Sequence, residues 1–185
     1  MCGLEMLNVG EGQRVLEIGF GTGHNALELA RAVGAPGRVC GVDLSARMCG
    51  ITRSRLEKHG LLERVLLAQA DGAFLPVGRS YFDAVFISFT LELFDTGEIP
   101  TVLRCCFEAL VSGGLICVVT MAKMEKPNLI SRLYEWGHRK YPQYLDCRPI
   151  YSRRSLQEAG FQVLDERRMW LAGLPIDVVL AQKID

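Results

Sequence analysis

A glycine-rich segment, residues 15–23 with the sequence VLEIGFGTG, contains the residue types best suited to hold a ligand. Gly19, Gly21 and Gly23 allow the backbone to turn sharply and to approach a ligand closely. The amides at the start of a following helix would point at the same ligand. Asp43 ends a second apolar segment, where its carboxylate can accept hydrogen bonds from the two hydroxyls of a ribose. The pattern predicts a nucleoside-containing ligand at the carboxyl edge of a parallel sheet.

The glycine spacing and one acidic residue favour a particular kind of nucleoside ligand. A dinucleotide fingerprint needs its third glycine at position 24, whereas this chain has His24 there and Gly23 one residue earlier. Glu17 precedes the first glycine by two residues, and a carboxylate at that point would repel a pyrophosphate. It can instead interact, directly or through water, with a cationic amino-acid group. These charges favour S-adenosylmethionine, which has no phosphate and carries an ammonium and a sulfonium.

The run E-x-G-x-G-x-G together with Asp43 resembles motif one and the acidic loop of class I S-adenosylmethionine-dependent methyltransferases. Three later segments resemble further motifs of the family, in the family's order. They are ADGAFLP at 70–76, like the adenine-binding turn, YFDAVFIS at 81–88, like the fourth strand, and LVSGGL at 110–115, like the turn into the fifth. The resemblance extends over residues 10–185 and leans towards the ubiquinone/menaquinone-biosynthesis-like methyltransferases.

The resemblance implies that S-adenosylmethionine is the cofactor and assigns it a set of contact residues. Glu17 would contact its amino-acid end, Asp43 the ribose, Asp71 the exocyclic amine of adenine and Met48 the adenine ring. The methyl group would be presented beyond the fourth strand, near Ser88 and Thr90. The full set of expected contacts is Glu17, Gly19, Phe20, Gly21, Gly23, Asp43, Leu44, Met48, Asp71, Gly72, Ala73, Ser88 and Phe89.

Each of these residues also has an ordinary structural explanation, which stays open at this point. The glycines could serve only turns and packing, and Glu17 could cap a helix or pair with a nearby cation. Asp71 could form only an Asx turn, and Met48 could belong to the core. Phe20 and Phe89 could be core aromatics, or they could line the site, where a ring face favours a sulfonium.

The elements that must position these residues follow from the spacing of apolar residues and from glycine and capping signals. They predict a doubly wound, Rossmann-like α/β fold with a mostly parallel seven-stranded sheet. The last two strands are joined by only residues 169–175, too few for a helical crossover, so they should form an antiparallel hairpin. The expected strands are 14–18, 38–42, 65–70, 82–88, 115–120, 161–168 and 176–182, and the expected helices 24–33, 45–59, 98–111 and 152–159.

Residues 121–150 form an insertion between the fifth strand and the next helix, and we expect it to act as a cap over the carboxyl edge of the sheet. It contains Tyr134 and His138, which are the candidates for contact with a methyl acceptor, although both could equally be packing residues. Residues 128–140 are expected to form an amphipathic helix. That helix would be a lid packed on the domain or, as the alternative, a contact with a membrane surface. Residues 3–7 should form a last turn of a helix ahead of the first strand.

Length and composition indicate the number of domains and argue against several classes of protein. The chain has 185 residues and a formal net charge of zero, which predicts one domain, residues 1–185, and no global electrostatic attraction to nucleic acid. No apolar run approaches the ~20 residues needed to cross a bilayer, and the first residues do not resemble a signal peptide. Seven scattered cysteines without a Cys-x-x-Cys suit a reducing cytoplasm and make a metal site improbable.

The sequence thus predicts methyl transfer to a small-molecule, lipid-like or quinone-like acceptor. The segment SFTL at 88–91 lacks the Asn-Pro-Pro-Tyr of methylases that act on nucleic-acid amines. His24 is tempting as a base, but a helix N-terminus disfavours imidazolium, so a structural role is the simpler reading. The sequence identifies no catalytic residue beyond the cap candidates. A nicotinamide-dependent oxidoreductase and a catalytically silent cofactor-binding protein stay open as alternatives.

Overall fold

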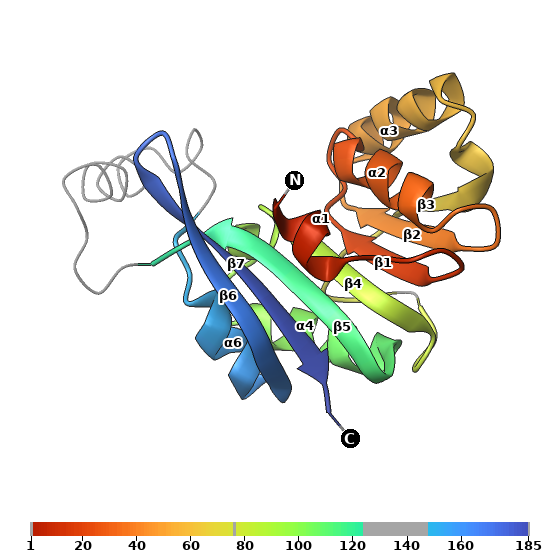
Figure 1. Ribbon diagram of the computed structural model, residues 1–185. Coiled ribbons are helices and arrows are strands. Elements are labelled where there is room, and N and C mark those ends of the chain that lie inside the picture. The colour runs from red at the N-terminus through yellow and green to blue at the C-terminus, as the bar shows by residue number, and fades with distance from the viewer. Residues whose placement is uncertain (1, 76, 124–147, 185) are drawn as a thin grey trace.

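The computed structural model describes residues 2–75, 77–123 and 148–184 (Figure 1). One seven-stranded sheet with the order β3-β2-β1-β4-β5-β7-β6 organises the molecule. Strands β1 to β5 pair in parallel, and β7 is antiparallel to both β5 and β6. The doubly wound sheet with a terminal hairpin is confirmed. The strands are β1 Arg14–Ile18, β2 Arg38–Asp43, β3 Val65–Gln69, β4 Phe82–Ser88, β5 Leu110–Met121, β6 Phe161–Leu171 and β7 Leu174–Lys183.

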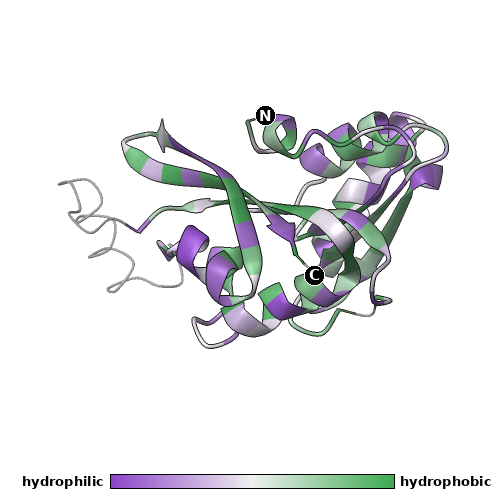
Figure 2. Ribbon diagram, turned by 60° about the horizontal axis from the view of Figure 1, so that its bottom comes forward, coloured by the Kyte–Doolittle hydropathy of each residue, from purple (hydrophilic) through white to green (hydrophobic). Residues whose placement is uncertain are grey.

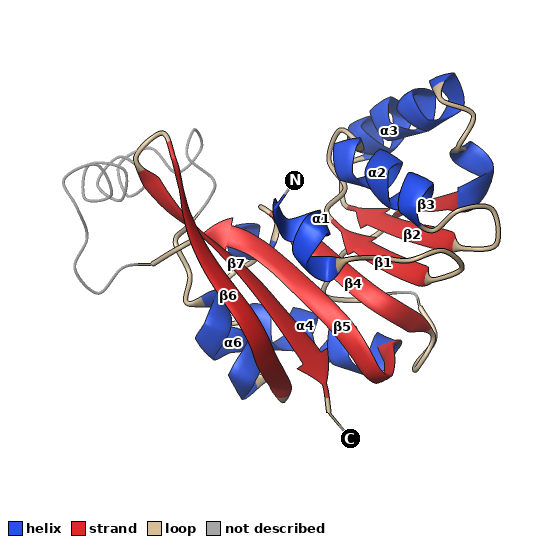
Figure 3. Ribbon diagram, viewed as in Figure 1, coloured by secondary structure: helices blue, strands red, loops and turns tan. Residues whose placement is uncertain are grey.

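Helices cover both faces of the sheet (Figures 1 and 3). One face carries α1 (Cys2–Leu7), α2 (His24–Ala32) and α3 (Ala46–Lys58), and the other carries α4 (Ile99–Ala109) and α6 (Ser152–Glu158). Short helical turns η1 (Leu62–Arg64) and η2 (Leu91–Leu93) follow α3 and β4. The chain reverses its direction of winding between β1 and β4, and this is the point at which ligands bind in such sheets.

The sheet has a hydrophobic core on each face because successive strand residues point to opposite sides. In β4, Val85 and Ile87 pack with the helices α4 and α6, whereas Ala84 and Phe86 pack with α1 and α2. All four side chains are buried, as expected for a strand covered on both faces. Figure 2 shows hydrophobic residues along the inner strands, and hydrophilic residues interrupting the edge strand β6.

The terminal hairpin is longer and its turn tighter than the sequence predicts. Residues 169–175 were expected to be a connection, but most of them extend β6 and β7. Only Ala172 and Gly173 form the turn, with φ of 49° and 82°, between the paired residues Leu171 and Leu174. Positive φ at both central residues is the type I′ geometry, whose twist matches that of the flanking strands.

Two further segments were predicted near the site. The turn expected at residues 3–7 belongs to α1, where the Sγ of Cys117 in β5 donates to the Gly3 carbonyl at 3.3 Å. Of the 121–150 insertion, only the two ends are described. They meet in a bridge in which the Ile150 amide donates to the Met121 carbonyl at 3.1 Å. Tyr134, His138 and the helix expected at 128–140 lie outside the described residues. Within the described part of the chain, no helix is long and apolar enough to cross a membrane.

Candidate cofactor-binding site

A cavity of about 560 Å³ lies at the carboxyl ends of β1, β2 and β4. Its lining brings together residues from four separate parts of the sequence, within 18–21, 42–48, 70–72 and 88–98, as expected for a site at the reversal point of the sheet. The predicted contacts that line it are Gly19, Gly21, Asp43, Leu44, Met48, Asp71, Gly72, Ser88 and Phe89. The structure shows that these residues line one cavity, whereas their contact with a bound cofactor stays a prediction.

Two glycines of the turn, Gly19 and Gly23, pack tightly against threonine side chains, and Gly19 and Gly21 both line the cavity. Gly19 and Gly23 have φ of +72° and +78°, and a Cβ at either would overlap the side chain of Thr90 or Thr52, respectively. Gly21, with φ +51°, has nothing within 4 Å of the place where a Cβ would lie. Thr52 Oγ1 donates to the Gly21 carbonyl at 2.9 Å and fixes the turn from the side of α3.

Asp43 joins the turn after β1 to the loop after β2. Its Oδ2 accepts a hydrogen bond from the Gly21 amide at 2.9 Å, and its Oδ1 accepts one from the Ser45 amide, also at 2.9 Å. Ser45 in turn caps α3, since its Oγ accepts from the Met48 amide at 3.4 Å. These bonds place Leu44, which is 71% exposed, and Met48 at the cavity.

Asp71 forms the Asx turn that the sequence allows, whereas its contact with adenine stays a prediction. Its Oδ1 accepts from the Ala73 amide at 2.9 Å, which makes an Asx turn, and the residue also lines the cavity. Gly72 is required by close packing, because a Cβ there would lie 2.8 Å from Ile18 and 2.9 Å from Phe94. Ala73 is buried behind the turn and is not part of the lining.

The segment after β4 carries a strained residue at the cavity. Phe89 has φ of +50°, which is uncommon for an aromatic residue, and its amide donates to the Val119 carbonyl of β5 at 2.8 Å. Strain of this kind is maintained where the surrounding structure requires it, often at a ligand site. Thr90 follows and donates to the carbonyls of Ser88 and Gly19 at 3.0 and 3.3 Å, so the two loops are joined.

Glu17 lies in β1 and is 1% exposed, and neither of its carboxylate oxygens has a hydrogen-bond partner among the described residues. Burial raises the pKa of its carboxyl to about 8, and repulsion by Asp43 acts in the same direction. Asn25, the smallest of the three influences, acts in the opposite direction and lowers the pKa. A buried carboxyl without a partner is unfavourable. Glu17 and the nearby Asp43 therefore make this end of the site complementary to a cation.

Several residues lie elsewhere than a simple reading of the motif suggests. Glu17, Phe20, Gly23 and Ala73 do not line the cavity. Phe20 is 3% exposed and packs against Gly41, so its core role is the one seen. His24 is exposed, with its Nδ1 3.1 Å from the Arg55 guanidinium. Three further lining residues were not predicted, namely Leu93, Phe94 and Glu98. Leu93 and Phe94 belong to η2 and the residue after it, which have no periodic pattern, and Glu98 was expected only as the start of a helix.

The site suits S-adenosylmethionine for three structural reasons. The buried, unpartnered carboxyl of Glu17 is suited to a nearby ammonium, Asp43 is positioned between two loops at the end of β2, and the open space at Gly21 admits a ligand against the backbone. Among the described residues, no group of three or more histidine, cysteine, aspartate or glutamate side chains could hold a metal ion.

Comparison with known proteins agrees with this assignment. The family model for a methyltransferase domain matches residues 15–114. The ubiquinone/menaquinone biosynthesis C-methyltransferase UbiE of Cellvibrio japonicus is 32% identical over 132 residues, which cover 71% of this chain and 52% of that protein. UbiE of Vibrio cholerae is 34% identical over 126 residues, covering 67% and 46%. The chain thus spans about half the length of the curated relatives that it matches.

A solved structure of an S-adenosylmethionine-dependent methyltransferase from Methanosarcina mazei shares the fold. It has a TM-score of 0.80 at 18% identity and covers 98% of this chain and 97% of that one. The sequence motifs, the strand order of the sheet and the family match all indicate a methyltransferase. The chain therefore belongs to the methyltransferase domain family, as a class I member for which S-adenosylmethionine is the cofactor.

Proposed function

We propose that this protein transfers a methyl group from S-adenosylmethionine to a small-molecule or lipid-like acceptor, with a ring carbon of a quinol as the first candidate. The observation that carries the proposal is the cavity that gathers the glycine turn, Asp43, Asp71 and Phe89 beside the buried carboxyl of Glu17. The acceptor class is supported by relatives named as ubiquinone/menaquinone biosynthesis C-methyltransferases.

The residues of this chain would act mainly by binding and orientation. The cofactor, when bound, supplies a methyl group attached to a positively charged sulfur. Asp43 lines the cavity, and we assign its carboxylate to the ribose hydroxyls. Glu17 does not line the cavity but precedes the lining residue Ile18, and a positive amino-acid group acting directly or through water would stabilise its ionised form. Holding the methyl donor and the acceptor in line lowers the activation barrier, because much of the entropy loss is then met by binding. The apolar side chains of Leu93 and Phe94 help to exclude water.

Methylation at a ring carbon also requires removal of a proton, which calls for a base. His138 and Tyr134 stay the proposed candidates and lie outside the described residues. That the 121–150 insertion serves as a cap within a single domain, residues 1–185, also stays a proposal. The same holds for a cytoplasmic location with at most peripheral contact with a membrane.

Ligand binding tests the cofactor assignment first. The thermal unfolding midpoint should rise with S-adenosylmethionine and with S-adenosylhomocysteine, and it should not rise with NADH. A ligand present at one hundred times its dissociation constant stabilises the folded state by ~2.7 kcal/mol, which is several degrees for a domain of this size. A rise with NADH alone would instead support the oxidoreductase alternative.

Turnover tests the activity itself. With a quinol and with phenol and lipid acceptors, methylated product should be detected by mass spectrometry, together with S-adenosylhomocysteine. Asp43→Asn should weaken S-adenosylhomocysteine binding by at least about tenfold, since the carboxylate of a charge-assisted hydrogen bond is lost. Asp165→Asn on β6 is the matched control and should bind normally. Cofactor binding without product from any acceptor in a cell extract would favour the silent alternative.

A further inference from the structure

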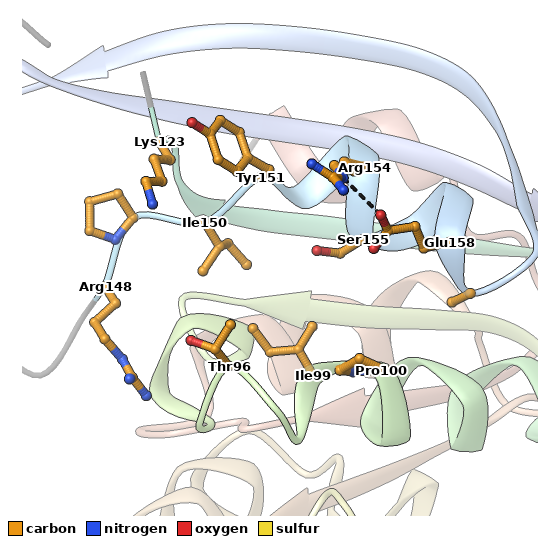
Figure 4. Close-up of a pocket in the computed structure, with 12 residues that line it drawn as sticks. Thr96, Ile99, Pro100, Lys123, Arg148, Ile150, Tyr151, Arg154, Ser155 and Glu158 are labelled. Carbon is orange, nitrogen blue, oxygen red and sulfur yellow. Dashed lines mark hydrogen bonds and ion pairs between the residues drawn. The ribbon is translucent and has the colours of Figure 1, made fainter. Parts of the chain in front are cut away.

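A second cavity, of about 460 Å³, lies between α4 and α6 and is bounded by the two described ends of the 121–150 insertion (Figure 4). We call it the α4–α6 cavity. Ile99 from α4 and Ile150 from the returning end of the insertion point toward each other across it. Pro100 and Ala159 extend this apolar surface. Its volume lies within the range of small-molecule sites.

The α4–α6 cavity and the cofactor cavity are separate, because they share no lining residue. The segment that begins α4 divides them, since Thr96 and Ile99 face the α4–α6 cavity and Glu98 faces the other. This segment is held by backbone hydrogen bonds from the amides of Glu98 and Ile99 to the Asp95 carbonyl, at 2.8 and 3.3 Å. A ligand of the α4–α6 cavity would therefore occupy space that the methyl donor does not need.

The charged side chains of the α4–α6 cavity are mainly basic. Lys123, Arg148 and Arg154 line it, and Glu158 is the one carboxylate in its described lining. Two of the cations already have partners. The Arg154 Nε donates to Glu158 at 2.7 Å, and the Arg148 guanidinium donates to Asp95 at 3.0 Å. Lys123 differs from them, because no carboxylate of the described residues lies within 4.0 Å of its ammonium.

Lys123 lies beside the apolar lining of the α4–α6 cavity, where it could bind the charged group of a ligand whose remainder is apolar. Its ammonium lies 5.3 Å from the centre of the Tyr151 ring, a cation–π contact that leaves donors available for an anion. Tyr151 is 43% exposed and lines the cavity together with Ile99 and Ile150. A cation with no carboxylate partner among the described residues, beside apolar walls, complements a molecule with one acidic group and a hydrophobic remainder.

We propose that the α4–α6 cavity is a second binding site, which takes an organic acid with an apolar body, such as an aromatic carboxylate. Lys123 binds the acidic group, and Ile99, Ile150 and Tyr151 contact the hydrophobic part. Glu158 opposes binding, because its charge repels the acid and neutralises Arg154. The site is independent of the methyl transfer proposed above.

Titration calorimetry with 2-naphthoate and with its neutral counterpart 2-naphthylmethanol tests this proposal. The naphthoate should bind more tightly than the alcohol, by about fivefold for one partly exposed ion pair. Its affinity should fall as the salt concentration rises, since exposed charges are screened. Saturation with S-adenosylhomocysteine should leave its affinity unchanged. Absent binding, equal binding of acid and alcohol, or displacement by S-adenosylhomocysteine would overturn the proposal.

Two substitutions with opposite effects locate the site. Lys123→Met should weaken naphthoate binding about fivefold, whereas Glu158→Gln should strengthen it about threefold by releasing Arg154. Lys58→Met, at the exposed end of α3, removes the same charge elsewhere and should change nothing. Thermal unfolding of each variant shows that it is folded. If Lys58→Met weakens binding as much as Lys123→Met, or if Glu158→Gln does not strengthen it, the acid is not bound in this cavity.

Discussion

Glu17 and Asp43 are both carboxyl residues at the ends of neighbouring strands, yet their surroundings differ completely. Asp43 accepts hydrogen bonds from two loop amides, whereas Glu17 is buried and has no hydrogen-bond partner among the described residues. The motif in the sequence predicts that both residues belong to the site, because it resembles the family's glycine-rich motif and acidic loop at both positions. It does not indicate that Glu17 is inaccessible, since burial depends on what packs over β1.

Glu17→Gln should change the pH dependence of stability. The carboxyl has an ordinary pKa of 4.5 and a folded-state pKa of about 8. Between these values only the unfolded chain releases the proton, so stability falls as pH rises, by up to about 3 kcal/mol at pH 7. Glu92 is buried, and its pKa is raised to about 7, which adds to the same slope. The variant should therefore be more stable than the natural chain at pH 8 and nearly equal to it at pH 4.5.

Chemical denaturation between pH 4.5 and pH 8 measures this difference, with Glu63→Gln as the control at an exposed position. The same Glu17→Gln variant should bind S-adenosylhomocysteine more weakly, because a cationic group loses its partner. Parallel slopes for the variant and the natural chain would show that Glu17 ionises normally in the folded protein.

At the scale of elements, two glycines of the turn are needed for different reasons: Gly19 for packing against Thr90, and Gly21 for space beside a ligand. Gly19→Ala should destabilise the protein by about 2–4 kcal/mol, because it combines positive φ with overlap on Thr90. Gly21→Ala should lose only about 1–2 kcal/mol from the positive φ. Its methyl group would project into the cavity, so it should weaken S-adenosylhomocysteine binding in a protein that still folds. Urea unfolding and calorimetry distinguish the two variants, and equal losses of stability would contradict this account.

The β6–β7 turn offers a stabilising substitution. Ala172 has φ of 49°, a conformation that asparagine adopts more readily than alanine in type I′ turns. Ala172→Asn should raise stability by about 0.5–1 kcal/mol, or about 1–3 °C in the unfolding midpoint. Ala35→Asn, at an exposed position outside the positive-φ set, should not. An unchanged or lower midpoint for Ala172→Asn would show that the turn does not limit stability.

The helices and strands were predictable from the sequence where burial gives apolar residues a regular spacing, or where a glycine ends the element. Strands β1 and β4 have the expected bounds, because both are apolar runs between clear turn signals. The start of β5 was predicted at 115 and lies at Leu110. The double glycine at Gly113 and Gly114 suggests a turn, but here it accompanies an irregular register in which Leu110 pairs with Phe82. Pairing partners distant in sequence decide such ends, and local patterns do not contain them.

For the whole molecule, the order of motifs was enough to predict the family and the sheet, whereas the acceptor side was not predictable. The donor site is assembled from backbone turns and a few fixed residue types, so its signature is local. The α4–α6 cavity, which is separate from the methyl transfer, was not predictable either, because Lys123, Ile99 and Tyr151 come together only after β5, α4 and α6 have packed. A scaffold shared by many reactions cannot by itself indicate the acceptor.

The position of β7 has a consequence for how the protein is made. β7 lies between β5 and β6 in the sheet, although it follows both in the chain. Among the described strands β6 pairs with β7 alone, so a nascent chain on the ribosome holds both β5 and β6 before their common partner is made. At ~5–20 residues per second, synthesis from Met121 to Lys183 leaves the apolar edge of β5 open for about 3–12 s. Such an edge can pair with other chains. We therefore expect chaperones to bind the nascent chain mainly during this interval.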